Sequence, residues 1–255
     1  MQVWWLEQSV TEMPLADDWL SPSEKLRLAD LRFPKRRTDW RLGRWTAKQA
    51  VTAYLKAPSD PQTLARIEIR SAESGAPEVF RDNDPCGVSI SITHSTGIAA
   101  CAVAAAQVSI GCDLEFLEPR SDAFLTDYLT EAEQALVNRV AQDERVVFSN
   151  LLWSAKESAL KLLKVGLRLD TRCVEVRVGK KSLKAAESSS GHVRDWQPLT
   201  VSRAGDHDVA GWWMSSGDFV RTIVTAPSST APRILSLSHA QDDSRRQMQR
   251  AVGNQ

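Results

Sequence analysis

The stretch Gly111-Cys112-Asp113-Leu114-Glu115 ends an apolar run that begins at Ile98, and it decides how the centre of this chain folds. In a β-strand, successive side chains point to opposite faces of the sheet. Asp113 and Glu115 therefore share one face, and Leu114 takes the other. The stretch predicts a mostly buried strand whose end carries two carboxylates side by side.

A second cluster, Trp153-Ser154-Ala155-Lys156-Glu157-Ser158-Ala159-Leu160-Lys161, follows a helical pattern. Trp153, Glu157 and Lys161 are spaced by four residues and so share one helix face. Taken alone, each cluster is also typical of a solvated surface, where an exposed ion pair contributes only a few tenths of a kcal/mol. Together they offer three hard oxygen ligands for Mg²⁺ and one cation for a phosphate, which favours a phosphoryl-transfer site.

The composition is that of an ordinary globular chain. It has 255 residues, 42% hydrophobic and 25% charged, with 32 basic and 32 acidic side chains. Because these charges cancel, no net field favours nucleic acid or membranes. The four cysteines lack C-x-x-C spacing and are expected to be reduced thiols. Residues 1–10 lack the pattern of a signal peptide, and the apolar run 98–106 is too short for a membrane helix. We expect a cytoplasmic protein that binds neither nucleic acid nor membrane.

Helical patterns followed by strand patterns occur in both halves of the chain, so we expect an α+β fold of two similar lobes. No residue-level repeat stands out between them. The expected divisions are an N-terminal lobe at 1–107, a C-terminal lobe at 108–225 and a polar, mobile tail at 226–255. The tail begins in a linker-like stretch, and we expect it to be mobile unless Ile234, Leu235 and Leu237 dock on the protein.

The segment from Lys25 to Lys48 is strongly basic, with nine Lys or Arg residues against the acids Asp30 and Asp39. A solvated helix face is one interpretation. An anion site is the other, because Arg binds phosphate oxygens in a bidentate manner and Lys supplies a point charge. Thr93-His94-Ser95, at a predicted strand end, could add donors to such a site, although a lone histidine is more often packed or on the surface.

The two acidic clusters, with Gly166-Leu167 after the second, resemble the signature of the 4'-phosphopantetheinyl transferase superfamily. Upstream, Gly43-Arg44-x-x-Ala47-Lys48, Gly75-Ala76-Pro77 and Thr93-His94-Ser95 are similar to its other motifs, in the same order. The chain length resembles that of the two-lobed monomeric type, which activates carrier proteins of peptide, polyketide and fatty-acid synthases. The resemblance implies a pseudo-two-fold pair of lobes with the active site in the cleft between them.

The resemblance also implies an activity. The enzyme would transfer the 4'-phosphopantetheine arm of coenzyme A to a serine hydroxyl of an apo acyl or peptidyl carrier protein and release adenosine 3',5'-bisphosphate. Asp113, Glu115 and Glu157 would hold Mg²⁺, with Mn²⁺ as an alternative ion. Glu157 is the candidate base, acting directly or through water, and Lys161 would offset charge on the phosphoryl oxygens.

The remaining contacts implied by the resemblance involve coenzyme A. Its phosphates would be bound by Lys35 or Arg36 together with Arg44, Lys48, Thr93 and His94, and its adenine would lie against Gly75, Ala76 and Pro77. Ala76 stands where many relatives have lysine, which leaves only backbone contacts there.

The carrier protein would dock on the C-terminal lobe. Its apolar contacts are expected near Phe116, Leu117, Phe124, Tyr128 and Leu129, which could equally be core residues, and Arg120 could attract an acidic carrier.

Two other interpretations come from different classes of protein. A nucleic-acid-binding module could use residues 25–48 with some of the nine tryptophans as stacking surfaces, but it leaves the acidic clusters unexplained. A noncatalytic carrier-binding protein is disfavoured because all three carboxylates and Lys161 are present. A generic Mg²⁺ nuclease would not account for the upstream motifs.

Overall fold

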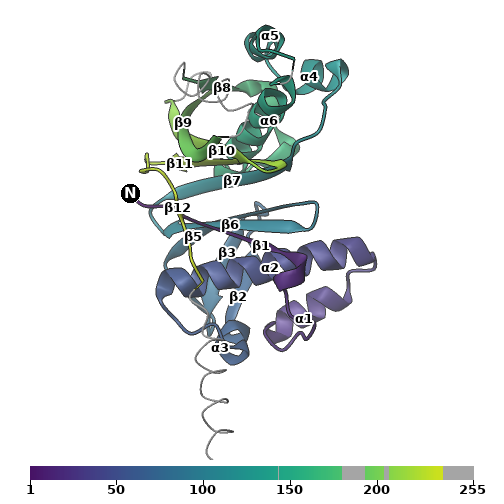
Figure 1. The fold of residues 1–255 in the computed structure, drawn as a ribbon. Helices are drawn as coiled ribbons and strands as arrows, with labels where there is room; N and C mark the ends of the chain where they lie inside the picture. Colours follow the sequence, from purple (N-terminus) through teal and green to yellow (C-terminus); the bar gives the residue numbers. More distant parts are fainter. Residues whose placement is uncertain (143, 180–192, 204–206, 238–255) are drawn as a thin grey trace, which may run out of the picture.

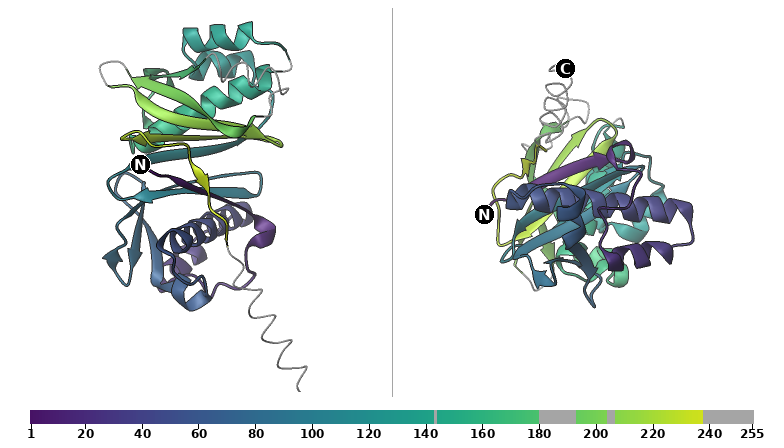
Figure 2. Two further views of the ribbon diagram at one scale, coloured as in Figure 1. Left: turned by 60° about the vertical axis from the view of Figure 1, so that its left-hand side comes forward. Right: turned by 90° about the horizontal axis from the view of Figure 1, so that it is seen from below.

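The computed structural model describes residues 1–142, 144–179, 193–203 and 207–237. Two sheets lie face to face, and a long helix covers the outer face of each (Figures 1 and 2). The predicted α+β class is confirmed. The elements are β1 (Trp4–Ser9), η1 (Val10–Glu12), α1 (Pro22–Ala29), α2 (Pro34–Leu55), α3 (Pro61–Arg66), β2 (Ile67–Ser71), β3 (Pro77–Arg81), β4 (Asp84–Pro85), β5 (Val88–Ser95), β6 (Ile98–Ala105), β7 (Ser109–Phe116), α4 (Asp122–Tyr128), α5 (Glu131–Arg139), α6 (Arg145–Leu162), η2 (Gly166–Arg168), η3 (Thr171–Cys173), β8 (Val174–Val178), β9 (Val193–Arg203), β10 (Val209–Ser216), β11 (Phe219–Ala226) and β12 (Arg233–Ile234).

The first sheet has the strand order β12-β1-β6-β5, and α2 packs across β6 and β1. Its central strand β6 is buried on both faces, which explains the apolar run in the sequence. Ala100, Ala102 and Ala104 face the second sheet, while Cys101 and Val103 face the cluster that includes Ala47 of α2. Small side chains on the inner face suit a strand that lies between a sheet and another sheet.

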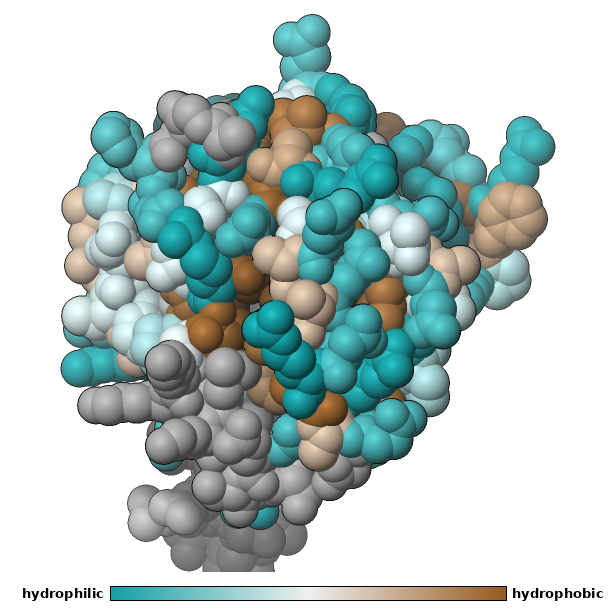
Figure 3. Space-filling model, turned by 90° about the horizontal axis from the view of Figure 1, so that it is seen from above, coloured by the Kyte–Doolittle hydropathy of each residue, from teal (hydrophilic) through white to brown (hydrophobic). Residues whose placement is uncertain are grey.

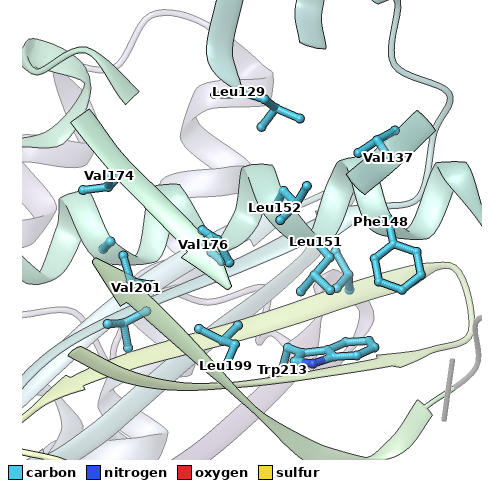
Figure 4. Packing of buried hydrophobic residues seen from close by; sticks show 14 of the residues in the cluster. Leu129, Val137, Phe148, Leu151, Leu152, Val174, Val176, Leu199, Val201 and Trp213 are labelled. Atoms are coloured by element: carbon cyan, nitrogen blue, oxygen red, sulfur yellow. The ribbon is translucent and has the colours of Figure 1, made fainter. Parts of the chain in front are cut away.

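The second sheet has the order β7-β11-β10-β9-β8, with α6 packed on β7 and β11. Its core lies between α6 and the sheet and includes Leu151, Leu152, Leu199 and Trp213 (Figure 4). A separate small sheet, β2-β3-β4, lies beside the first sheet through contacts of β3 with β5.

Helix α6 lies directly on the backbone of β7 at Gly111. A Cβ at this position would be 1.9 Å from the Ser158 carbonyl oxygen and 2.6 Å from the Leu162 nitrogen. Any side chain here would force the helix and strand apart. The glycine that opens the acidic motif therefore sets the depth at which α6 sits, and with it the positions of Glu157 and Lys161.

The first part of the expected mobile tail is docked on the first sheet. β12 pairs in parallel with β1, and the Leu235 nitrogen donates to the Trp5 carbonyl at 2.8 Å. Leu235 and Leu237 also pack against the cluster under α2. Residues 238–255 lie outside the described residues, so the expectation of a mobile end stays a prediction for them.

The two long helices carry a residue-level repeat, which corrects the expectation that none exists. Trp45-Thr46-Ala47-Lys48-Gln49 of α2 corresponds to Trp153-Ser154-Ala155-Lys156-Glu157 of α6, 108 residues later. The correspondence continues to Lys56 and Lys164, which both have positive φ angles, of 54° and 58°. This recurrence is consistent with two similar lobes, whose boundary at residue 107 stays a prediction.

The repeat extends to a buried ion pair in each half. Lys48 and Lys156 are both fully buried; Lys48 pairs with Glu24, and Lys156 pairs with Glu133 at 2.8 Å. Both glutamates occupy the third position of a capping box, at the start of α1 and of α5. The second oxygen of each accepts a backbone N–H from a strand, that of Ile69 at 3.1 Å or Val176 at 2.7 Å. Each long helix is thus fastened through its lysine to a short helix and a strand.

Gly111→Ala should lower the free energy of unfolding by about 1–3 kcal/mol, because the added methyl group must displace the α6 backbone. Urea denaturation of the variant and the original chain measures the loss. Gly179→Ala is the matched control, since a Cβ at Gly179 meets nothing within 4 Å. Equal midpoints for the two variants would contradict the close contact.

Candidate active site between the two sheets

Strands β5 and β7 bring two of the predicted motifs together. The Cys112 nitrogen donates to the Ser91 hydroxyl at 3.0 Å, and the Thr93 hydroxyl donates to Asp113 Oδ1 at 2.9 Å. Asp113 is buried, so this hydroxyl replaces part of its lost hydration. The Thr-His-Ser motif and the Asp-x-Glu motif therefore meet at Thr93 and Asp113. Sequence reasoning missed Ser91, because a serine in an alternating strand carries no special signal.

Lys161 of α6 reaches across to β7. Its Nζ lies 2.7 Å from Asp113 Oδ1 and 3.1 Å from the Cys112 carbonyl oxygen. Burial is the largest single effect on the pKa of Lys161 and lowers it, but the charge and hydrogen bond of Asp113, together with Cys112 and Glu157, outweigh burial and raise this pKa. Lys161 is therefore held as a cation next to Asp113, as the pairing of the two acidic clusters predicts.

Glu115 is held by Arg120, in the segment before α4, and by Trp153 of α6. Its Oε1 accepts the Trp153 indole N–H at 3.0 Å, and its Oε2 accepts from Arg120 at 3.0 Å. Burial, and then the neighbouring Asp113 charge, raise the pKa of Glu115 to about 7 despite these donors. Trp153 and Arg120 thus act as positioning residues for this carboxylate. Only the helical spacing of Trp153 to Glu157 hinted at such a role.

Two carboxylate oxygens at this site are buried without a hydrogen-bond donor: Asp113 Oδ2 and Glu157 Oε1. Burial raises the pKa of Glu157, and Asp113 raises it further, although Lys161 opposes the shift. Unpartnered buried carboxylate oxygens are costly, and a hard cation would satisfy them. The donor chemistry therefore fits a divalent cation.

The ligand set predicted from the sequence is nevertheless not assembled in full. Among the residues that the structure describes, no three His, Cys, Asp or Glu side chains are grouped so that they could hold a metal ion. Glu115 is engaged by Trp153 and Arg120, and Lys161 occupies one oxygen of Asp113. Metal binding by Asp113, Glu115 and Glu157 together stays a prediction.

A cavity of about 600 Å³ has walls from both sheets and meets the site at Ser91 and Lys161, whereas Thr93, Asp113, Glu115 and Glu157 do not line it. One wall is formed by the turn before β3, by β3 and by β5, and the other by the start of β7 and the end of α6. Of the predicted site residues, Gly75, Ala76, Pro77 and Lys161 line it. A mostly apolar cavity of this size with a few polar groups is typical of a small-molecule site.

The predicted phosphate ligands on α2 do not line this cavity. Lys35 and Arg36 are exposed on the first turns of α2. The Arg44 guanidinium lies 4.9 Å from the Trp40 ring centre, and its buried Nε, without a hydrogen-bond acceptor, lies 4.0 Å from Glu24 Oε1. His94 is exposed at the end of β5. The basic segment at residues 25–48 therefore contributes no residue to the lining of the cavity.

The position of Lys48 does not suit its predicted role as a phosphate ligand. Its ammonium group is enclosed by Glu24 and by the carbonyl oxygens of Trp19 and Leu64, each at 3.0 Å, and the side chain has no exposed surface. Burial lowers the pKa of Lys48, although Glu24 opposes the shift. A lysine with these contacts anchors α2 and does not reach a ligand, which argues against the predicted phosphate contact.

The residues proposed for carrier docking divide between surface and core. Phe116 and Tyr128 are exposed, whereas Leu117 and Phe124 are half-buried against the core of the second sheet. Leu129 is fully buried and points into that core (Figure 4), so of the two roles left open it is a core residue and not part of a docking surface. On the end of the molecule that carries α4 and α5, hydrophobic residues are interspersed with hydrophilic ones (Figure 3).

The stability of the chain should depend on pH through Glu115. Its pKa is about 7 when folded and about 4.3 when unfolded, so between these values the folded state keeps a proton that the unfolded chain releases. The free energy of unfolding should therefore fall as the pH rises from about 4.5 to about 7. Denaturation at a series of pH values without divalent cations measures this slope. Glu115→Gln should flatten it and the exposed Glu73→Gln should not; an unchanged slope in Glu115→Gln would contradict the assignment.

Lys48→Met should lower the free energy of unfolding by about 3–5 kcal/mol, because Glu24 would be left as a buried, unpaired charge. Affinity for coenzyme A, the ligand that the resemblance implies, should be unchanged where the variant is folded. Chemical denaturation and calorimetric titration measure the two effects, with the exposed Lys35→Ala as the control for stability. A large loss of affinity without a loss of stability would restore the phosphate-binding role.

No helix among the described residues is long and apolar enough to cross a membrane.

Comparisons with known proteins concern mainly the C-terminal half. Residues 109–210 match the model of the 4'-phosphopantetheinyl transferase superfamily. No curated protein sequence matched the chain.

Two solved structures show partial similarity. The holo-[acyl-carrier-protein] synthase of Helicobacter pylori in complex with coenzyme A has 18% identity and a TM-score of 0.33, covering 41% of this chain and 99% of that one. The holo-(acyl-carrier-protein) synthase of Bacillus anthracis in complex with CoA (3',5'-ADP) has 20% identity and a TM-score of 0.35, covering 40% of this chain and 92% of that one. The resemblance of this chain to the 4'-phosphopantetheinyl transferase superfamily is confirmed by the match over residues 109–210.

Proposed function

We propose that this chain transfers the 4'-phosphopantetheine arm of coenzyme A to a serine hydroxyl of an apo carrier protein. One observation carries the proposal: Asp113, Glu157 and Lys161, all within the segment that matches the superfamily, lie close together, and Lys161 lines a cavity built from both sheets. The superfamily match supports the class of reaction, and the cavity offers room for a cofactor-sized ligand.

In the proposed reaction, the serine oxygen attacks the phosphorus atom that carries the pantetheine group. A new P–O bond forms to serine, the pyrophosphate P–O bond breaks, and adenosine 3',5'-bisphosphate leaves. The serine proton passes to Glu157, directly or through water. The raised pKa of Glu157 supports this role, since a general base works best when its pKa lies near the working pH.

Lys161 is proposed to stabilise charge on the phosphoryl oxygens, because it is held as a cation at the cavity wall. Asp113 and Glu157, with Glu115 as a third ligand, would hold Mg²⁺ or Mn²⁺, which would supply Lewis-acid neutralisation of the pyrophosphate. The unpartnered oxygens of Asp113 and Glu157 support this ligand set. Glu115 would need to release Trp153 or Arg120 to join it.

For coenzyme A, we propose that the adenine lies against the backbone of Gly75, Ala76 and Pro77, which line the cavity. His94 and Arg44, with Lys35 or Arg36, remain proposed phosphate contacts outside it. Lys48 is left out because its ammonium group is fully engaged inside the protein.

The carrier protein is proposed to dock near Phe116 and Tyr128, the exposed members of the predicted surface, with Leu117 and Phe124 beneath them. Phe116 follows Glu115 directly on β7, and the Tyr128 ring packs edge-to-face with Trp153, with 5.0 Å between the ring centres, so this surface adjoins the carboxylates. We propose that this carrier serves secondary-metabolite or fatty-acid synthesis.

Incubation of the chain with coenzyme A, Mg²⁺ and a panel of apo carrier proteins should add the phosphopantetheine mass to a carrier, as seen by intact mass spectrometry. Glu157→Gln and Asp113→Asn should reduce the rate at least about a hundredfold, the scale of lost general-base catalysis. Glu131→Gln, an exposed glutamate on α5, is the matched control.

The outcome also separates the other classes of protein. Carrier binding without a mass change would favour a noncatalytic carrier-binding protein. Binding of nucleic acid that weakens steeply with salt, without transfer, would favour the basic module instead. Full activity in Glu157→Gln or in Asp113→Asn would exclude the role assigned to that carboxylate.

A further inference from the structure

Lys164 has an unusual backbone at the end of α6. Its φ angle is 58°, in the left-handed region that disfavours residues with a Cβ. The Lys164 nitrogen donates to the Lys161 carbonyl at 3.0 Å, and the Val165 nitrogen donates to the Leu160 carbonyl at 3.1 Å. Glycine usually occupies this position of a helix end. A lysine here carries a conformational cost that glycine would avoid.

The same residue lines the cavity, together with Lys161 and Gly166. The Lys161 ammonium group is already engaged by Asp113 and the Cys112 carbonyl. The Lys164 ammonium group, in contrast, makes no hydrogen bond or ion pair with any residue of the described ranges. Lys164 therefore brings an uncommitted positive charge to the cavity, where Glu78 is the other charged lining residue besides Lys161.

The rest of the lining suits the apolar or flat part of a ligand. Val79, Phe80 and Ile90 come from the first half of the chain, and Ile110 and Leu162 from the second. A ligand that fills this cavity and also carries an anionic group would place that group best near Lys164, since lysine is a strong point-charge partner for phosphate.

The repeat provides an internal comparison. Lys56 ends α2 with a φ angle of 54°, and its nitrogen donates to the Ala53 carbonyl at 3.2 Å, while the Ala57 nitrogen donates to the Thr52 carbonyl at 2.9 Å. This is the same helix end, 108 residues earlier. Lys56 does not belong to the lining of the cavity. Favourable interaction with the helix dipole applies to both lysines, so only the position at the cavity distinguishes Lys164.

We infer that Lys164, through its position at the cavity, is a binding residue for the anionic phosphate groups of coenzyme A. This inference rests on the proposed function. It adds to the motif residues a contact that comes from the end of α6. Backbone strain retained at a ligand site is a known way in which proteins exchange stability for binding.

The test compares Lys164→Gly, Lys164→Met and Lys56→Gly. Coenzyme A binding is measured by calorimetric titration without a carrier protein, at low and high ionic strength, and stability by urea denaturation. Both glycine variants should keep or raise the unfolding midpoint, because glycine adopts a positive φ angle without the Cβ penalty. Lys164→Gly and Lys164→Met should both weaken coenzyme A binding about tenfold and reduce its dependence on salt, and Lys56→Gly should change neither.

Three outcomes of this binding experiment would contradict the inference. Unchanged affinity in both Lys164 variants would overturn the inference while leaving the proposed function intact. An equal loss in Lys56→Gly would also overturn it, because the effect would then belong to helix ends in general. Failure of the original chain to bind coenzyme A at all would overturn the proposed function and the inference together.

Discussion

The contact between the backbone of α6 and Gly111 of β7 is the constraint on which the site depends. Without a side chain at Gly111, the Ser158 carbonyl and the Leu162 nitrogen lie against the strand itself. At this depth the helix brings Lys161 within hydrogen-bonding distance of Asp113, and Glu157 within its electrostatic reach. A looser contact would separate the groups that are proposed to act on one phosphate, and small displacements of reacting groups are costly to catalysis.

That close approach also concentrates negative charge in a poorly hydrated place. Glu115 and Glu157 both have raised pKa values, mainly through burial, while Lys161, Trp153 and Arg120 supply only part of the compensation. Two carboxylate oxygens remain without a donor. Such uncompensated groups are typical of functional sites, where a ligand completes what the protein leaves open.

The two halves share a frame but not the chemistry placed on it. In each, a fully buried lysine fastens the long helix through a capping-box glutamate to a strand. Where α6 has Glu157 and Lys161, however, α2 has Gln49 and Ala53 at the corresponding positions. The frame explains why both helices keep their lysine. The groups that are proposed to react lie in the second half, and the first half contributes the opposite wall of the cavity.

By itself, the sequence determined the α+β class, the strand that carries Asp113 and the helix that carries Lys161, because hydrophobic periodicity reports which side chains share a face of an element. It could not determine what packs on that face. Lys48 appeared to be a phosphate ligand and Leu129 a docking residue, yet tertiary packing buries both. The repeat is hard to recognise in the sequence because it has few identical residues, and its similarity becomes clear only from the contacts that the two helices share. The cavity that Lys164 lines forms only where segments distant in sequence meet. Long-range packing decided these features, since burial and ion pairing depend on neighbours that no local pattern encodes.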